Sequence, residues 1–413
     1  MFWTTIGILA FLLVVSYLYS RSLVHPGVVT TGIWLVLLLI YNAADFDLYD
    51  LSDSFYKAVL LWACPFCVAS LISQPTSSLM PKVIAGDANP KILAFIKPFL
   101  LVALGVASLA LIYRGMLFNS SNILYGIRQA SVASLRGDED VIPFPIWLRP
   151  FITIANTAAL PTCLYLFVLK KDKSRYSKVL LVLLIVFYLL RSNKNVIAQV
   201  GLAFVCMLLL EQSVSKKKIT IVGLIMVIFM IGISYLRRIG IGKDEFVVTE
   251  FLAQYLLAPL PAFDSVLSSP SLIENFHGEY TFRAFVKILH VFDPSIVGNS
   301  DPLNLDNWVL TPLPVNVFTV LFPFYEDFGF PGLVIFGLLL GYFSGTIYKH
   351  AKKGFIVSKL VYSCMFYTLI FQFFADNLFQ FLWANVAYIL FCMLIVFRPI
   401  TIQTAKNKPE QAK

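Results

Sequence analysis

The chain has 413 residues, of which 59% are hydrophobic and 13% are charged, and its formal net charge is +9. A soluble protein of this length would carry about 25% charged residues, so the composition excludes an ordinary soluble domain. Apolar runs recur along the whole chain, and many reach the roughly 17–25 residues that cross a bilayer. Because these runs are continuous and do not alternate with polar residues, they predict an all-α polytopic membrane protein rather than a β-barrel.

The apolar runs predict eleven transmembrane helices in a single transmembrane domain that covers residues 1–413. The first run has no basic segment before it and no small-residue cleavage site after it, so we expect a membrane span there and not a signal peptide. The predicted spans are 2–19, 28–43, 55–73, 98–113, 151–169, 179–191, 195–210, 219–236, 331–348, 357–375 and 380–397.

The connections between these spans separate by charge. Basic residues fill 170–178, 216–218, 349–353 and the tail 398–413, whereas 45–53 is acidic. Because Lys and Arg remain on the cytoplasmic side, alternate counting predicts an external N-terminus and a cytoplasmic C-terminus and tail. The net positive charge is thereby explained by topology, and we predict no nucleic-acid partner.

Two predicted external loops are long, namely 114–150 and 237–314. Loops of this length are usually functional or disordered. The second loop is rich in Phe, Leu, Tyr and Trp, which argues against disorder. It contains the weakly amphipathic stretches EFVVTEFLAQYLLAPL and TFRAFVKILHVF, which we expect on the membrane surface.

Arginines on the external side are the candidates for binding phosphate. The positive-inside rule disfavours arginine on that face, and a planar guanidinium matches phosphate oxygens in bidentate fashion. The alternatives are contact with lipid headgroups or ion pairs with acids of the same loops, such as Asp138 and Asp244. The candidates for the pyrophosphate of a lipid carrier are Arg128, Arg136, Arg237, Arg238 and Arg283.

Glu326 and Asp327 are adjacent acids at the predicted outer mouth of the span 331–348. A carboxylate in a dry cleft can have a raised pKa and act as a general base. Alternatively, either acid pairs with an arginine, or Asp327 caps the helix that Pro331 helps to begin. Adjacent side chains point in different directions, so we expect at most one of the two to be catalytic.

His277, in the stretch ENFHGEYTFRAF, is a third candidate for proton transfer because histidine titrates near neutral pH. A lone histidine is more often structural. Tyr325 offers an aromatic ring for stacking on a sugar, although an interfacial aromatic belt is the more common reason for a single aromatic residue there. We find no cluster with metal-ligand spacing and no nucleotide-binding fingerprint, so we predict neither a metal nor a cofactor.

The segment NVFTVLFPFYEDFGFPGLVIFGLLLGYFSGTIY resembles the late part of Wzy-type polymerases, the O-antigen and capsule repeat-unit polymerases of bacteria. In that family an Asn-x-x-Thr step, here Asn316-Val-Phe-Thr319, precedes an Asp-Phe-Gly sequence, here Asp327-Phe328-Gly329. A further glycine and a Leu-Gly-containing span follow, here Gly332 and 340–341. The span number and the two long external loops are also similar to the family, whose architecture is GT-C-like.

The resemblance implies a glycosyl transfer at the outer face of the bacterial inner membrane. The growing glycan on undecaprenyl pyrophosphate would be passed to a hydroxyl of the next lipid-linked repeat unit, without a nucleotide sugar or a required cofactor. Arginines would stabilise the leaving pyrophosphate, and Asn316, Thr319 and Tyr325 would contact the glycan. Asp327, Glu326 or His277 would remove the acceptor proton, or Asp327 would orient an arginine. The expected partners are the lipid-linked oligosaccharide, the bilayer, a chain-length regulator and a flippase.

Two other functions fit the same pattern. One is the related ligase, which moves finished polymer from the same carrier to another acceptor. The other is a flippase for the lipid-linked unit, which should carry ionisable residues along a cavity inside the membrane. Here the charges collect outside the spans, with few exceptions such as Asp376 near a span end, and this favours an enzyme.

Overall fold

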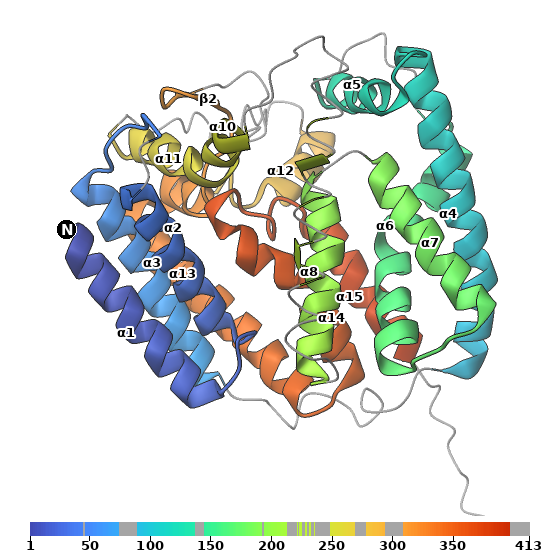
Figure 1. The fold of residues 1–413 in the computed structure, drawn as a ribbon, viewed down its shortest axis with the longest axis horizontal. Coiled ribbons are helices and arrows are strands. Elements are labelled where there is room, and N and C mark those ends of the chain that lie inside the picture. Colours follow the sequence, from blue (N-terminus) through green and yellow to red (C-terminus); the bar gives the residue numbers. More distant parts are fainter. Residues whose placement is uncertain are drawn as a thin grey trace, which may run out of the picture.

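Apolar helices make up most of the computed structural model. They stand side by side as a bundle, and shorter elements lie across one end of it (Figure 1). The structure describes residues 1–43, 46–73, 89–136, 144–191, 194–212, 248–268, 278–293 and 309–396, together with isolated positions between 221 and 235.

Apart from isolated helical positions between 221 and 235, the described secondary structure belongs to the bundle or to the shorter elements. The bundle contains α1 (Phe2–Ser20), α2 (Pro26–Ala43), α3 (Asp53–Ile72), α4 (Pro90–Phe118), α6 (Arg149–Leu164) with the π-helical turn η3 (Tyr165–Leu169), α7 (Arg175–Leu190), α8 (Lys194–Leu210), α13 (Leu321–Lys352), α14 (Ile356–Ile370) with the 3₁₀ turn η5 (Phe371–Phe373), and α15 (Leu382–Val396). The shorter elements are α5 (Ile123–Arg136), η2 (Ile146–Leu148), α10 (Val248–Leu252), η4 (Ala253–Leu257), α11 (Pro259–Leu267), α12 (Arg283–Phe292), and the antiparallel strands β1 (Val309–Leu310) and β2 (Pro314–Val315).

The prediction of an all-α multi-pass membrane protein is confirmed in its main feature. Seven helices of the described chain are long and apolar enough to cross a membrane, and α8 and α15 are shorter apolar helices. The predicted span 179–191 coincides with α7, which has 16 residues. Most of the predicted span 219–236 lies outside the described residues, so the count of eleven spans stays a prediction.

Two helices extend well beyond the apolar runs that predicted them. Helix α4 begins at Pro90, where the Asn89 Oδ1 accepts a hydrogen bond from Lys91 N at 3.0 Å and caps the helix. Helix α13 begins at Leu321, ten residues before the predicted start at residue 331. The helix is broken at Gly329, however, so Glu326 and Asp327 lie at the end of its first segment, just before the segment that contains the predicted span 331–348.

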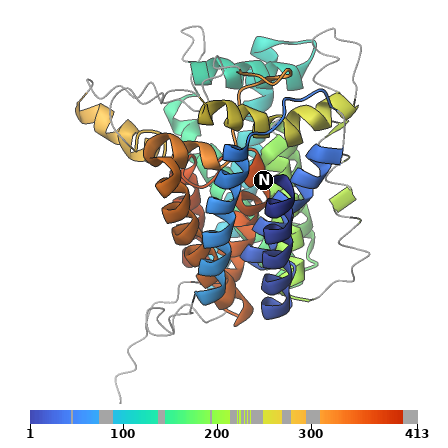
Figure 2. The same cartoon turned by 90° about the vertical axis from the view of Figure 1, so that its left-hand side faces the viewer.

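Elements from both predicted external loops gather at the same end of the bundle, which we call the loop end. Helix α5 belongs to the predicted loop 114–150, while α10, α11 and α12 belong to the predicted loop 237–314. Figure 2 shows these helices lying across the top of the spans. Whether the loop end faces outward, and the rest of the predicted domain division, remain predictions.

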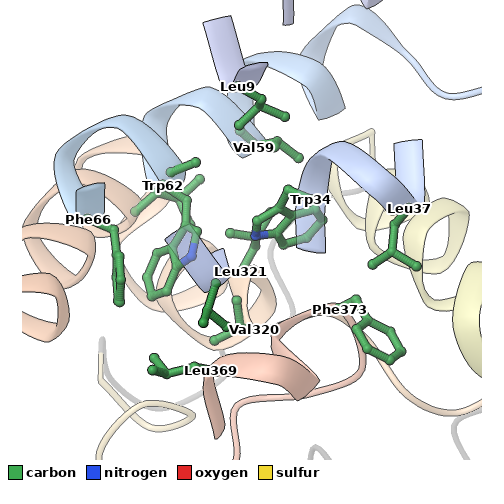
Figure 3. Close-up of a cluster of buried hydrophobic side chains, with 14 of the residues drawn as sticks. Leu9, Trp34, Leu37, Val59, Trp62, Phe66, Val320, Leu321, Leu369 and Phe373 are labelled. Atoms are coloured by element: carbon green, nitrogen blue, oxygen red, sulfur yellow. The ribbon is translucent and has the colours of Figure 1, made fainter. Parts of the chain in front are cut away.

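The buried apolar side chains form two large clusters, and α8 and α14 contribute to both. The first cluster joins α1, α2, α3 and α13, and the second joins α4, α6, α7, α8 and α15. Helix α14 contributes Phe366 and Leu369 to the first cluster and Leu360 and Cys364 to the second. In Figure 3, Val320 and Leu321 at the start of α13 lie between Trp62 of α3 and Leu369 of α14. The first cluster thus lies directly beneath the start of α13.

Helices α3 and α13 are in backbone contact along a row of glycines. A Cβ atom on Gly337 would lie 2.9 Å from Trp62 O, and one on Gly341 would lie 2.2 Å from Phe66 O. One on Gly345 would lie 2.6 Å from Ser70 O. Small residues at every fourth position allow two membrane helices to approach closely, so this row fixes α13 against α3.

Two lysines at the end of α13 hold the ends of other helices, at the end of the bundle opposite to the loop end. Lys349 Nζ donates to Leu71 O and Ser73 O at the C-terminus of α3, and Lys352 Nζ donates to Ser20 O at the C-terminus of α1. Carbonyl groups at a helix C-terminus have no partner within the helix and attract cations. These basic residues, which the sequence predicts as topology signals, therefore also cap helices.

Candidate functional site

The Asp-Phe-Gly sequence produces a break in α13. Gly329 has φ 63° and ψ −156°, a backbone conformation that residues with a Cβ rarely adopt, and Pro331 follows two residues later. The first segment of α13 therefore carries the two acids, and the second segment carries the glycine row. The break places the C-terminal part of the first segment beside the turn 278–282.

The carboxylate of Asp327 binds that turn through both of its oxygens. Tyr280 N donates to Oδ1 at 3.2 Å and Thr281 N donates to Oδ2 at 2.6 Å, and the Asp327 side chain is 1% exposed. Thr281 Oγ1 also donates to Pro323 O at 3.2 Å. The oxygens of Asp327 thus bind backbone donors more than forty residues earlier in the chain, and the carboxylate joins α13 to this turn.

The turn held by Asp327 leads directly into α12, whose first residue is Arg283. Arg283 lines a cleft at the loop end together with Thr319 and Asp376, so three distant parts of the sequence meet there. Tyr280 and Gln380 complete its polar lining. The cleft encloses about 30 Å³, which holds about two water molecules, so a sugar or a phosphate that enters it must move its walls.

Thr319 belongs to the segment that joins β2 to α13. Its Oγ1 accepts a hydrogen bond from Leu321 N at 3.3 Å, and Val320 N donates to Gln372 O at 2.7 Å. The first bond joins Thr319 to the start of α13, and the second fixes this wall of the cleft to the end of α14. Asn316 is half-buried in the same segment, three residues before Thr319.

Asp376 is a site residue that the sequence reading did not select. It lies in the turn between η5 and α15 and is 7% exposed, and Leu378 N and Phe379 N donate to its Oδ1 at 3.0 and 3.2 Å. Burial raises the pKa of Asp376 to about 6, although these backbone donors act in the opposite direction. In the sequence, Asp376 is recognisable only as an acidic residue between the last two apolar runs. An acidic residue at such a position is also expected where a side chain simply caps a turn.

Tyr325, Glu326 and Asp327 line a different space, an open groove on the other side of the turn 278–282. Its remaining walls are apolar and come from Phe282, Phe328, Gly329, Pro331, Gly332, Ile335 and Phe336. Tyr325 packs edge to face against Phe263 and Phe330, and Glu326 is 6% exposed. The structure therefore brings Arg283 together with Thr319 but places Tyr325 and Glu326 in the groove.

Most of the residues around this site belong to a region that is similar to a known protein family. Residues 146–372, more than half of the chain, match the family described as "Putative O-antigen polymerase". The chain belongs to this O-antigen polymerase family. No curated protein and no solved structure matches the chain, so the comparison with a GT-C-like architecture stays a prediction.

The region that matches the O-antigen polymerase family contains most of the cleft. It includes Arg283, Thr319 and Asp327 and ends at Gln372, four residues before Asp376. The family supports a membrane polysaccharide repeat-unit polymerase, which acts on glycans attached to lipid.

Arg128 is the predicted arginine that the structure places between the two long loop segments. It lies on α5, burial lowers the pKa of its guanidinium, and the Tyr255 hydroxyl of η4 acts on it in the opposite direction. The Tyr255 ring stacks on Phe374 at a centroid distance of 6.2 Å. Arg128 is thus connected through Tyr255 to the turn that carries Asp376.

A neighbouring arginine, Arg114, has a structural role. Its Nη2 donates to Ala130 O at 3.4 Å, and its guanidinium carbon lies 4.5 Å from the centroid of the Phe144 ring. These contacts fix α5 to the end of α4.

The remaining predicted residues are described only in part or not at all. Arg136 is the last residue of α5. His277, Arg237 and Arg238 lie outside the described residues. Within the described ranges there is no group of three or more His, Cys, Asp or Glu side chains that could hold a metal ion.

Proposed function

We propose that this protein joins oligosaccharide repeat units on their lipid carrier at the outer face of the bacterial inner membrane. The growing glycan on undecaprenyl pyrophosphate is the donor, and a hydroxyl of the next lipid-linked unit is the acceptor. Family membership supports the class of reaction. The loop end faces outward in this proposal, with the N-terminus external and the C-terminus cytoplasmic. A flippase delivers the units, and a chain-length regulator acts on the product.

One observation carries the proposal for the site: Arg283 meets Thr319 in a cleft at the loop end. Arg283 is also the first residue of α12, and the N-terminus of a helix attracts anions. A guanidinium held there can bind the two phosphates and stabilise the charge that develops when pyrophosphate leaves.

Asp327 serves this arginine as a positioning residue. Its carboxylate binds the backbone of the turn that ends at Arg283, and both oxygens are used for this purpose. Thr319 and Asn316 contact the glycan, and Tyr325 contacts a sugar or the lipid from the groove. Arg128, Arg136, Arg237 and Arg238 form further contacts with the carrier, and Glu326 and His277 remain candidates for proton transfer.

The test is complementation of a strain from which the gene has been deleted. Arg283→Ala should reduce polymer formation by about a hundredfold, because one electrostatic contact to the leaving group is lost. Arg283→Lys should restore part of the activity, because lysine keeps the positive charge but lacks the paired N–H donors of the guanidinium. Arg175→Ala, which changes an exposed arginine at the start of α7, is the matched control and should polymerise normally.

The glycans of the deletion strain distinguish the other functions. Acceptor capped with a single repeat unit is the result expected for a missing polymerase. Accumulated carrier-linked polymer with no transfer would indicate a ligase, and repeat units retained on the cytoplasmic side would indicate a flippase. Normal polymer from Arg283→Ala, at normal protein level, would overturn the role of Arg283.

A further inference from the structure

The turn between α14 and α15 contains an unusual set of buried polar side chains for a chain with 13% charged residues. Gln372, Asp376, Asn377 and Asn385 are each less than 9% exposed. Asn385 Nδ2 donates to Asn377 O and Leu378 O at 3.1 and 2.9 Å, which fixes the turn. Buried ionisable groups are costly in membrane proteins and commonly functional, so Asp376 requires an explanation beyond the turn itself.

Asp376 lies where two cavities meet. One is the cleft that Arg283 and Thr319 also line. The other extends between α13 and α14 and is lined mainly by apolar side chains, including Phe66 and Leu340. Among the residues that line these two cavities, Asp376 is the only carboxylate and Arg283 is the only cation.

Three backbone N–H groups of the turn, those of Leu378, Phe379 and Gln380, stabilise the Asp376 carboxylate. Leu378 N and Phe379 N both donate to Oδ1, as in a cap, and an asparagine could accept the same two bonds. For the two bonds to Oδ1, the structural requirement is therefore an oxygen and not a negative charge. A carboxylate buried in a cleft that a cation also lines needs a chemical reason.

We propose that Asp376 is the proton acceptor of the transfer reaction, and this inference rests on the proposed polymerase function. As the acceptor hydroxyl oxygen attacks the anomeric carbon of the donor, its O–H bond breaks and the proton passes to Asp376 Oδ2. The new glycosidic C–O bond forms while the C–O bond to pyrophosphate breaks, and that electron pair leaves on the pyrophosphate oxygen beside Arg283. Asp376 then releases its proton to water.

The electrostatic surroundings fit this role. Burial raises the pKa of Asp376 to about 6, so the group is a carboxylate at neutral pH but a stronger base than an ordinary aspartate. The titratable and charged groups that face it are Arg283 and Tyr280 from the α12 side and Tyr367 from α14. Since the base acts in its deprotonated form, the rate should rise with pH through about 6 and then level off.

The experiment uses the purified full-length protein in liposomes, with lipid-linked repeat units extracted from the deletion strain. Asp376→Asn should insert and melt as the wild type does, because the amide oxygen keeps the two backbone hydrogen bonds. Its rate should fall by about 10²–10⁴-fold, and the rise through pH 6 should disappear. Asp376→Glu should recover part of the rate. Asp50→Asn, at an exposed acid between α2 and α3, is the matched control.

The outcomes separate this inference from the function on which it rests. A wild-type protein that forms no polymer from these units would refute the proposed function. Polymerisation by the wild type together with an unimpaired Asp376→Asn variant would overturn only the role of Asp376. Loss of the pH dependence in Glu326→Gln, with Asp376→Asn retaining it, would transfer the role to Glu326.

Discussion

Asp327 illustrates how a single carboxylate can organise a site without taking part in its chemistry. It joins two segments that are forty-six residues apart by accepting hydrogen bonds from Tyr280 N and Thr281 N. The same bonds fix the position at which α12 and Arg283 begin. A buried anion is tolerated here because two donors compensate for its lost hydration.

Asp327→Asn should therefore destabilise the fold. An amide presents only one oxygen, and its NH₂ group would face a backbone N–H that has lost its acceptor, which costs about 1–3 kcal/mol. We expect a lower melting temperature in detergent and weaker polymerisation, with the pH profile of the remaining activity unchanged in shape.

Asp376→Asn provides the contrast, since it should lose activity while keeping its melting temperature. An Asp327→Asn variant with wild-type stability and no polymer would instead indicate that the Asp327 carboxylate acts in the reaction. Measuring both variants in the same preparation makes the comparison direct.

Asp327 and Asp376 also show how much the sequence can predict about single residues of the site. The Asp-Phe-Gly pattern marked Asp327, but its partners are backbone N–H groups of a distant turn, which leave no trace in residue identity. From the sequence, Asp376 could be recognised only as an acidic residue near the end of a predicted span. Its importance depends on Arg283 and Thr319 approaching it from two other segments, which no local pattern records.

At the scale of elements, the spans follow from hydropathy but their neighbours do not. The predicted spans coincide with described helices wherever the chain is described, because an apolar run of sufficient length must bury its backbone in helical hydrogen bonds. The early starts of α4 and α13 were missed, since polar and proline residues in their first turns obscure the pattern. The contact of α13 with α3 was also missed, although Gly337, Gly341 and Gly345 were present in the sequence.

Gly341→Ala should weaken this helix pair. The added Cβ would lie 2.2 Å from Phe66 O, so the two backbones must separate, at a cost of about 1–3 kcal/mol. We expect a melting temperature several degrees lower than that of the wild type, measured in detergent.

Gly105→Ala is the matched control within another span, α4, because nothing lies within 4 Å of the position of its Cβ. It should leave the melting temperature unchanged or raise it slightly, since alanine favours a helix over glycine. Equal effects of the two substitutions would contradict the close packing of α3 and α13.

For the whole molecule, the decisive property is which end of the bundle faces outward. The two long loop segments gather at one end, as alternate counting of the basic connections predicts. Two apolar clusters that share α14 hold this arrangement together. Sidedness decides whether Arg283 can meet a lipid-linked glycan outside the cell membrane.

Cysteine labelling on intact spheroplasts tests this orientation. A membrane-impermeant maleimide should label Ser121→Cys, an exposed position before α5, but should label Lys173→Cys only after the membrane is permeabilised. The wild type provides the background, because five of its six cysteines are buried. The reverse labelling pattern would place the cleft in the cytoplasm and refute the proposed function.

The glycine row has a consequence for how a substrate could enter. Backbones in direct contact hold the second segment of α13 against α3, and the hydrogen bond from Val320 N to Gln372 O holds the Thr319 wall of the cleft to the end of α14. The opposite wall begins at Arg283, on a short amphipathic helix whose outer residues Val291 and Phe292 are largely exposed. We therefore expect that α12, and not α13, moves when a lipid-borne sugar enters the cleft, and that the turn held by Asp327 limits this movement.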